Sequence, residues 1–351
     1  MHITFLAPCK DLSGGIKVIA TYGNKLVERG HTVTIVYPQS TQPLKRRIKR
    51  GMIKFVKQQQ DHLDRFKGQL LAVKEFNNRT IPDGDVLIAT AWETAEWAKG
   101  LSNSKGRKVY FIQGHEVWNG QQERVYDTLQ LPFKKITIST WLQELLTDIS
   151  GDEDISMISN ASDFKINPQD DSQVKRKYDI GMTFSSISNK GSNLGLQAIR
   201  QIAKTYPGLK FVLFGTEAPS EDLPLNTTVF VKPSQKKIGA IYESTRIWLS
   251  TSYEEGFCLP CLEAMSSGSV VISTDNKGVR DIVDHKKNGM ITKTGSSNAL
   301  VEKIALLLEH PEEMKRLQSA GFKKSETFSW DDSTTRMEAI FSEICKQEQA
   351  A

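Results

Sequence analysis

The stretch YEEGFCLPCLEAM, residues 253–265, carries two carboxylates and two cysteines around a proline-containing turn. Seven residues separate Glu255 from Glu263. An ionised carboxylate accepts several hydrogen bonds. The pair can therefore bind the hydroxyl groups of a sugar or a ribose, and the two groups need not act as an acid and a base.

The same stretch contains a Cys-x-x-Cys pair, Cys258 and Cys261. A structural zinc site would need two more ligands at suitable spacing, and neither a second Cys-x-x-Cys nor paired histidines follow it in the sequence. A thioredoxin-like pair is expected after the first strand of a small domain. We therefore interpret both cysteines as small buried residues, and we expect no metal.

Strand-like runs at 245–252 and 269–274 flank the acidic stretch. Pro260 suits the first turn of a short helix, and Gly268 suits its C-terminal cap. We therefore expect Glu255 in a loop at the carboxyl end of a strand and Glu263 on the helix that follows.

A second candidate site is the glycine pair Gly14 and Gly15, between the first strand-like run and the helical pattern after it. Glycine lets backbone N–H groups approach a ligand, and a helix N-terminus favours anions. The pair therefore suits a phosphate or a sugar, although a simple tight turn explains it equally well. It does not match the G-x-G-x-x-G dinucleotide pattern.

Strand-like runs alternate with helical patterns along the 351 residues, which predicts βαβ units and parallel sheets. The length favours two domains. We expect an α/β fold with two Rossmann-like, doubly wound domains facing a cleft, and ligands at the carboxyl ends of the strands. The expected parts are residues 1–163, a polar linker at 164–177, residues 178–330 and a final helix at 331–351. The strand-like runs cover residues 2–7, 31–37, 85–90, 107–113, 134–139, 155–159, 178–184, 209–214, 227–231, 245–252 and 269–274.

The composition, 38% hydrophobic and 25% charged, is that of a soluble globular protein. No apolar run approaches the ~18 residues that a membrane span requires, and the first residues predict a strand rather than a signal peptide. Four cysteines are too few for a disulfide scaffold. We expect a cytoplasmic protein.

Residues 44–57, LKRRIKRGMIKFVK, contain seven lysines or arginines and no acid. Apolar residues at helical spacing (Leu44, Ile48, Met52 and Phe55) interrupt these cations. The pattern is typical of a helix on an anionic membrane surface, and a solvated basic helix is the alternative. Nucleic acid is a weaker candidate because few aromatic residues accompany the cations. The protein would then be peripheral on the inner face of the membrane.

The acidic stretch resembles the Glu-seven-residues-Glu signature of the retaining nucleotide-sugar glycosyltransferases of family 4, which have the GT-B architecture. Further segments resemble the family in the same order along almost the whole chain. They are residues 159–163, 180–191 ending in Lys-Gly, 211–215, 275–283, 288–290 and 328–330, where a final helix begins that crosses back to the N-terminal domain.

The resemblance implies that the C-terminal domain binds a nucleotide diphosphate sugar and that the N-terminal domain takes the acceptor. Glu255 would contact the donor sugar, Glu263 the ribose, and Lys190 would neutralise the diphosphate. The cation stabilises charge on the leaving group, so neither a metal nor a cofactor is expected. Other residues expected at the donor are Gly14, Gly15, Ser185, Gly215, Gly256, Phe257, Cys258 and Leu259, the last three through backbone N–H groups near the sugar or diphosphate.

Two positions depart from the family pattern. Ser185 stands where an arginine is usual, and Arg280 and Lys232 are candidates to replace its charge. Lys277 stands where the family usually has a glycine pair.

In the N-terminal half, QGHEVWNG (113–120) follows a strand-like run. By resemblance, His115 is a candidate catalytic residue and Glu116 faces the donor sugar or the acceptor. Trp118 and Trp92 are candidates to stack on a sugar, although tryptophan more often fills a core.

These features predict a retaining hexosyltransferase that uses a nucleotide sugar in bacterial surface polysaccharide or glycolipid assembly, with a glycan or a lipid-linked acceptor and no nucleic acid. Two alternatives remain. One is a different GT-B enzyme such as a sugar-nucleotide epimerase, which the acidic stretch disfavours. The other is a weak or inactive partner subunit, which only Ser185 favours.

Overall fold

The computed structural model describes residues 1–39, 61–117, 121–165 and 176–347. The chain forms two compact units. The first unit contains Met1–Asn160 and the chain from Trp330 onward, and the second contains Ala161–Ser329. The basic segment 44–57 lies outside the described residues, as do Trp118 and most of the expected linker.

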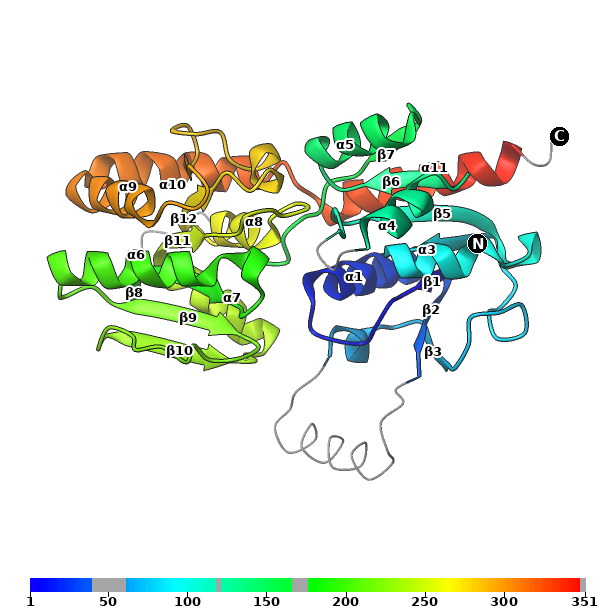
Figure 1. Ribbon diagram of the computed structural model, residues 1–351, viewed down its shortest axis with the longest axis horizontal. Coiled ribbons are helices and arrows are strands. Elements are labelled where there is room, and N and C mark those ends of the chain that lie inside the picture. The colour runs from blue at the N-terminus through cyan, green and yellow to red at the C-terminus, as the bar shows by residue number, and fades with distance from the viewer. Residues whose placement is uncertain (40–60, 118–120, 166–175, 348–351) are drawn as a thin grey trace, which may run out of the picture. The chain divides into compact units, whose positions relative to one another are not determined.

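The first unit is built on a parallel sheet with the strand order β3-β2-β1-β4-β5-β6-β7 within the described residues (Figure 1). The strands are β1 (His2–Leu6), β2 (Thr32–Pro38), β3 (Gln69–Val73), β4 (Val86–Ala89), β5 (Arg107–Ile112), β6 (Lys134–Thr137) and β7 (Ile155–Met157).

Helices cover both faces of this sheet, because successive side chains of a strand point to opposite faces. Tyr110 of β5 belongs to a core cluster with α3 and α4, whereas Phe111 packs edge-on against Tyr22 of α1. The helices of this unit are α1 (Gly14–Glu28), α3 (Trp92–Lys99), α4 (Gln122–Leu129), α5 (Thr140–Ser150) and α11 (Trp330–Gln347), with the short helices η1 (His62–Arg65) and η2 (Asn103–Lys105).

The final helix α11 belongs to the first unit, as the resemblance predicts. The Arg29 guanidinium binds the Glu338 carboxylate and donates to the carbonyl of Asp331 at 2.7 Å. The ring of Trp330 packs edge-on against Tyr22 of α1, with 5.2 Å between the ring centroids. Polar and aromatic contacts therefore hold the end of the chain against α1.

The second unit contains a parallel sheet with the order β10-β9-β8-β11-β12-β13 within the described residues (Figure 1). Its strands are β8 (Tyr178–Phe184), β9 (Phe211–Gly215), β10 (Thr227–Val231), β11 (Thr245–Ser250), β12 (Val270–Thr274) and β13 (Met290–Thr292). Its helices are α6 (Ser192–Thr205), α7 (Gln235–Glu243), α8 (Leu259–Ser266), α9 (Ser297–Glu309) and α10 (Pro311–Ser325), with the short helices η4 (Ser188–Lys190) and η5 (Gly278–Asp281).

Strand β11 shows how this sheet is packed on both faces. Ile247 and Leu249 join the core cluster that α6 and α9 complete. Trp248, between them, packs on Tyr242 of α7 at 4.5 Å between ring centroids. Gly181 of β8 leaves room for that indole, since a Cβ there would lie 2.5 Å from it.

The two parallel α/β sheets confirm the predicted fold class. The sequence patterns missed β3 and β13, which both lie at sheet edges. Among the described residues, no helix is both long and apolar enough to cross a membrane.

Candidate functional site

Two predicted site residues of the second unit, Lys190 and Glu255, lie at the carboxyl ends of its strands, as does Lys277. Lys190 follows β8, Glu255 follows β11, and Lys277 follows β12. All the strands are parallel, so these ends share one edge of the sheet, where open α/β sheets bind ligands.

Lys190 and Glu255 form the central contact of this edge. The Lys190 Nζ lies 2.9 Å and 3.0 Å from the two carboxylate oxygens of Glu255. The hydroxyl of Ser252 donates to the same carboxylate at 2.7 Å. The lysine side chain is 42% exposed and the glutamate 16%, so a ligand can reach the cation.

The charge on Lys190 is stabilised by this contact. Burial alone would lower its pKa, but the negative charge and hydrogen bond of Glu255, together with Cys258, raise the pKa above its ordinary value. Lys190 is therefore a fixed cation at neutral pH.

The turn after Lys190 requires glycine. Gly191 has φ of +59°, and a Cβ at this position would lie 2.1 Å from the carbonyl oxygen of Thr251. The close approach of the two loops brings Lys190 to Glu255, 65 residues further along the chain.

The loop after β12 is joined to the loop after β11. The N–H of Glu255 donates to the carbonyl of Asn276 at 2.9 Å. Lys277 has φ of 66° and ψ of −61°, which is a strained conformation for a residue with a side chain. Its Nζ binds Glu254 at 2.5 Å. A second lysine–glutamate pair therefore lies next to the first.

Helix α8 begins at this edge. Cys258 is its N-cap residue, with φ of 65°, and a proline occupies its first turn, as predicted. Both Cys258 and Cys261 are buried, also as predicted. The amino end of α8 therefore presents the backbone of residues 257–259 at the edge of the sheet.

Glu263 is 6% exposed. It makes a hydrogen bond with a residue outside the Lys190–Glu255 pair. Its Oε2 accepts a hydrogen bond from the Tyr242 hydroxyl at 3.0 Å. Burial, and then the charge of Glu263, raise the pKa of Tyr242 well above its ordinary value. The two glutamates of the acidic stretch thus have different partners.

Three residues bear on the second positive charge at the donor site: Ser185, Arg280 and Lys232. Each of them makes a contact within the second unit. The N–H of Ser185 donates to the Ser192 hydroxyl at 2.9 Å. Arg280 makes two contacts with Asp275, at 2.8 Å and 2.9 Å. The N–H of Lys232 donates to the carbonyl of Gly215 at 2.7 Å, so this residue lies beside the end of β9.

In the first unit, Gly14 begins α1, and the N-cap Ser13 accepts a hydrogen bond from the N–H of Ile16. His115 stacks on Tyr126, and its Nε2 lies 3.4 Å from the tyrosine hydroxyl. Trp92 is buried beneath the guanidinium of Arg124, as a packing residue would be.

Glu116 accepts a hydrogen bond from the N–H of Trp92, the first residue of α3, at 2.9 Å. Burial raises the pKa of Glu116 to about 7, although the helix N–H opposes the shift. This carboxylate is therefore partly protonated at neutral pH.

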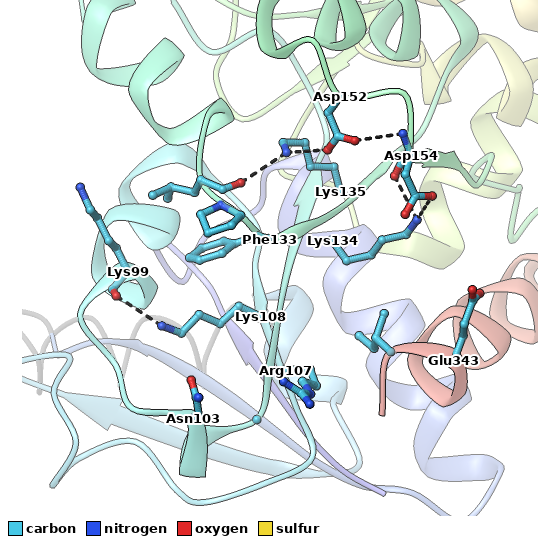
Figure 2. A pocket seen from close by; sticks show the side chains of 14 residues that line it. Lys99, Asn103, Arg107, Lys108, Phe133, Lys134, Lys135, Asp152, Asp154 and Glu343 are labelled. Carbon is cyan, nitrogen blue, oxygen red and sulfur yellow. Dashed lines mark hydrogen bonds and ion pairs between the residues drawn. The ribbon is translucent and has the colours of Figure 1, made fainter. Parts of the chain in front are cut away.

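The first unit also has a basic pocket of about 1010 Å³ at the amino ends of β5 and β6 (Figure 2). Lys135 is paired with Asp152 at 2.7 Å, and Lys134 with Asp154. Lys108 donates to the carbonyl of Lys99 at 3.3 Å. These cations already have partners, and the pocket lies at the opposite strand ends from His115 and Gly14.

Three side chains that shape the candidate site were not predicted: Ser252, Asn276 and Tyr242. Ser252 stands three residues before Glu255, and Asn276 is the second residue after the strand-like run 269–274. Because both residues follow strand-like runs, the sequence could have indicated that they lie at the site. Tyr242 had none, because its pairing with Glu263 depends on helix packing. No cluster of three metal-binding side chains occurs in the part of the chain that the structure describes.

Comparison with known proteins identifies a family that part of this chain matches. Residues 165–324 match the family model of the group 1 glycosyl transferases. An uncharacterized glycosyltransferase of Haemophilus influenzae is 28% identical over 134 residues, which is 36% of this chain and 38% of the relative. The putative glycosyltransferase EpsD of Bacillus subtilis is 27% identical over 161 residues, which is 44% of this chain and 42% of the relative. The matches thus span less than half of either relative.

The similarity to solved structures extends over almost the whole chain. A structure of Anabaena Alr3699/HepE with UDP and glucose has a TM-score of 0.76 at 16% identity, covering 98% of this chain and 100% of the other. A sucrose-phosphate synthase from Thermosynechococcus elongatus has a TM-score of 0.72 at 14% identity, covering 98% and 99%. These similarities show the fold, which is GT-B. The family match adds that residues 165–324, most of the second unit, are similar to the group 1 glycosyl transferases.

Proposed function

We propose that this protein transfers a sugar, a hexose, from a nucleotide diphosphate sugar to an acceptor hydroxyl and retains the configuration of the transferred sugar. The observation that carries the proposal is the Lys190–Glu255 pair at the carboxyl edge of the second sheet. It combines a cation for a diphosphate with a carboxylate for sugar hydroxyls, at the amino end of α8.

In this mechanism, the diphosphate replaces Glu255 as the partner of Lys190. Negative charge accumulates on the leaving diphosphate, and a preorganised cation stabilises it. The N–H groups of Phe257, Cys258 and Leu259 add partial positive charge at the helix N-terminus. The released Glu255, still held by Ser252, accepts hydrogen bonds from the sugar.

The base in this scheme is an oxygen of the leaving phosphate, which removes the proton of the acceptor hydroxyl on the face that the diphosphate leaves. No protein nucleophile is assigned. Glu263 would receive the ribose hydroxyls while it remains bonded to Tyr242, and His115 and Glu116 would face the donor sugar or the acceptor. Gly14, Gly15, Gly215 and Gly256 would allow the backbone to approach the donor.

A second cation is needed if Ser185 leaves the diphosphate short of one charge. Arg280 is paired with Asp275 and Lys277 with Glu254, but Lys277 also lies directly beside Glu255 through the backbone bridge between them. We assign this role to Lys277. Its strained backbone supports the assignment, because strain of this kind concentrates at functional sites.

The identities of the donor and the acceptor are proposals that we base on the relatives. The Anabaena structure contains UDP and glucose, so UDP-glucose is the first donor to test. A Bacillus subtilis relative, 24% identical over 190 residues, is a poly(glycerol-phosphate) alpha-glucosyltransferase. A glycan or lipid-linked acceptor of the bacterial surface is consistent with that name.

Such an acceptor would place the protein on the inner face of the membrane, held there by the basic segment 44–57. Flotation with anionic vesicles tests this. Changing Lys45, Arg46, Arg47, Lys49 and Arg50 to glutamate should abolish binding, and continued binding would contradict it.

The function is tested by thermal unfolding of the protein with UDP, GDP, dTDP, CMP and ADP and their sugars, with and without EDTA. A ligand at about 100 times its dissociation constant adds about 2.7 kcal/mol of stability. We expect one nucleotide to raise the Tm without metal and Lys190→Ala to abolish the rise. Lys67→Ala is the control, because it removes an exposed lysine that pairs with Glu28 in the first unit.

If no nucleotide raises the Tm, the inactive-partner alternative replaces this proposal. Ser185 is the feature that favours it. Release of free sugar from the donor by the purified protein would exclude that alternative.

A further inference from the structure

The two cysteines of the acidic stretch lie closer to each other than they would need to if they only filled space in the core. Their Sγ atoms lie 3.0 Å apart and share a hydrogen bond. Both are free thiols, 2% and 0% exposed. A disulfide bond is about 2.05 Å long, so a movement of roughly 1 Å would bring the two sulfurs to bonding distance.

Cys258 also lies among hydrogen-bonding groups. Its Sγ is 3.2 Å from the Ser250 hydroxyl and accepts from the Asn276 amide at 3.5 Å. It is the N-cap residue of α8, where the helix dipole favours a negative charge. These neighbours stabilise a thiolate on Cys258 in preference to Cys261.

The titration of the two thiols agrees with this asymmetry. The hydrogen bond with Cys261 lowers the pKa of Cys258, against the effect of burial. Burial raises the pKa of Cys261 well above its ordinary value. A thiolate is the reactive form of cysteine. Cys258 is therefore the nucleophile of the pair, and Cys261 is the second thiol, which can react with it after oxidation.

We propose that Cys258 and Cys261 are a redox modification site that closes to an intramolecular disulfide when a hydroperoxide oxidises Cys258. The Cys258 thiolate attacks the peroxide oxygen, the O–O bond breaks, and hydroxide or an alkoxide leaves and takes a proton from water, giving a sulfenic acid on Cys258. The Cys261 thiol then attacks the Cys258 sulfur, its proton goes to the departing oxygen, and water leaves. Two electrons pass from the two sulfurs to the peroxide, and a dithiol reductant reverses the step.

The consequence for the donor site rests on the proposed function. Asn276 binds Cys258 through its amide and Glu255 through its carbonyl. Movement of Cys258 therefore affects both the backbone N–H groups at the start of α8 and the loop that holds Glu255. We expect the disulfide form to bind the nucleotide about tenfold more weakly, which corresponds to about 1.4 kcal/mol.

The experiment uses full-length protein in which Cys9 and Cys345 are changed to serine, so that this pair supplies the only thiols. After treatment with hydrogen peroxide, native protein should lose both thiols and two hydrogen atoms of mass. Peptide mapping should show one Cys258–Cys261 cross-link that dithiothreitol removes. With Cys261→Ser, or Cys261→Ala if the first variant does not fold, oxidation should stop at a sulfenic acid on Cys258 that dimedone traps.

The proposal is overturned if native protein keeps both thiols while urea-unfolded protein loses them, or if the cross-links join separate chains. Nucleotide binding by the reduced and oxidised forms is measured separately. Equal affinities would remove the regulatory consequence and leave the modification site. Absence of nucleotide binding in both forms would count against the proposed function, and the thiol results would still decide the redox proposal.

Discussion

The two sheets have the same parallel architecture, but their carboxyl edges differ in chemistry. In the second unit, the edge carries paired charges, Lys190 with Glu255 and Lys277 with Glu254. In the first, it carries a glycine pair and the Lys10–Asp64 ion pair after β1, and the titratable side chains His115 and Glu116 after β5. Among the described residues, every non-glycine residue with positive φ lies in the second unit.

This difference separates two tasks that one fold can perform. Fixed charges and strained loops suit the binding of a highly charged group in one geometry. A carboxylate with a pKa near 7 suits proton exchange or hydrogen bonding with a neutral hydroxyl. We therefore expect the second unit to determine donor binding and the first to determine the response to the acceptor.

The largest effect is expected for Glu255→Gln. The amide keeps a hydrogen-bonding group but removes the charge that competes with a diphosphate for Lys190. Sugar transfer should fall about 10²–10³-fold, while the free nucleoside diphosphate should bind as tightly as before or more tightly. The measurements are kcat by product formation and Kd by calorimetry.

His115→Ala in the first unit is the matched variant for that comparison. Transfer should fall without any change in Kd for the nucleoside diphosphate. If the His115 variant also lost nucleotide affinity, the proposal that only the second unit determines donor binding would be contradicted.

Gly191→Ala should destabilise the second unit by at least about 2 kcal/mol. The added Cβ would meet the Thr251 carbonyl at 2.1 Å, in a backbone conformation that side chains disfavour. Gly14→Ala is the control, since a Cβ there meets nothing within 4 Å. Urea unfolding of both variants checks the prediction, and similar midpoints would contradict it.

Glu116 should make the stability of the first unit depend on pH. Its folded pKa of about 7 lies above the ordinary value of 4.5, so between these values the folded state binds more protons than the unfolded state. The free energy of unfolding should therefore fall as pH rises through this window, by at most about 1.4 kcal/mol per pH unit.

Glu116→Gln should remove that slope and leave the protein more stable than the wild type at pH 8. The measurement is the urea midpoint at pH 5, 6, 7 and 8. A slope that persists in the variant would assign the pH dependence to another group.

The smallest effect on stability is expected for Lys277→Gly. Relief of strain at φ of 66° favours the variant, but glycine loses about 0.5–1 kcal/mol through backbone entropy, and an exposed ion pair contributes about 0–1 kcal/mol. Stability should change by less than about 1 kcal/mol, while nucleotide affinity falls several-fold. Unchanged affinity would remove Lys277 from the donor site.

Much of the framework was predictable because its signals are local. The β8 and β10 runs were predicted to the residue, since alternating β-branched and aromatic residues between polar turns mark a strand. The start of α8 at its proline follows from the fixed φ of that residue. The missed strands give little local pattern: β3 has one buried residue in five, and β13 is only three residues long.

The sequence by itself determined the alternation of strands and helices, the two sheets and the placement of Glu255 after a strand and Glu263 on a helix. Only the tertiary structure decided what those side chains meet. Lys190 binds Glu255, which is 65 residues further along the chain, and Glu263 accepts a hydrogen bond from Tyr242. The Sγ atoms of Cys258 and Cys261 lie 3.0 Å apart. The reason is physical: backbone preferences act over a few residues, whereas ion pairs and desolvation depend on which distant segments the packed core brings together.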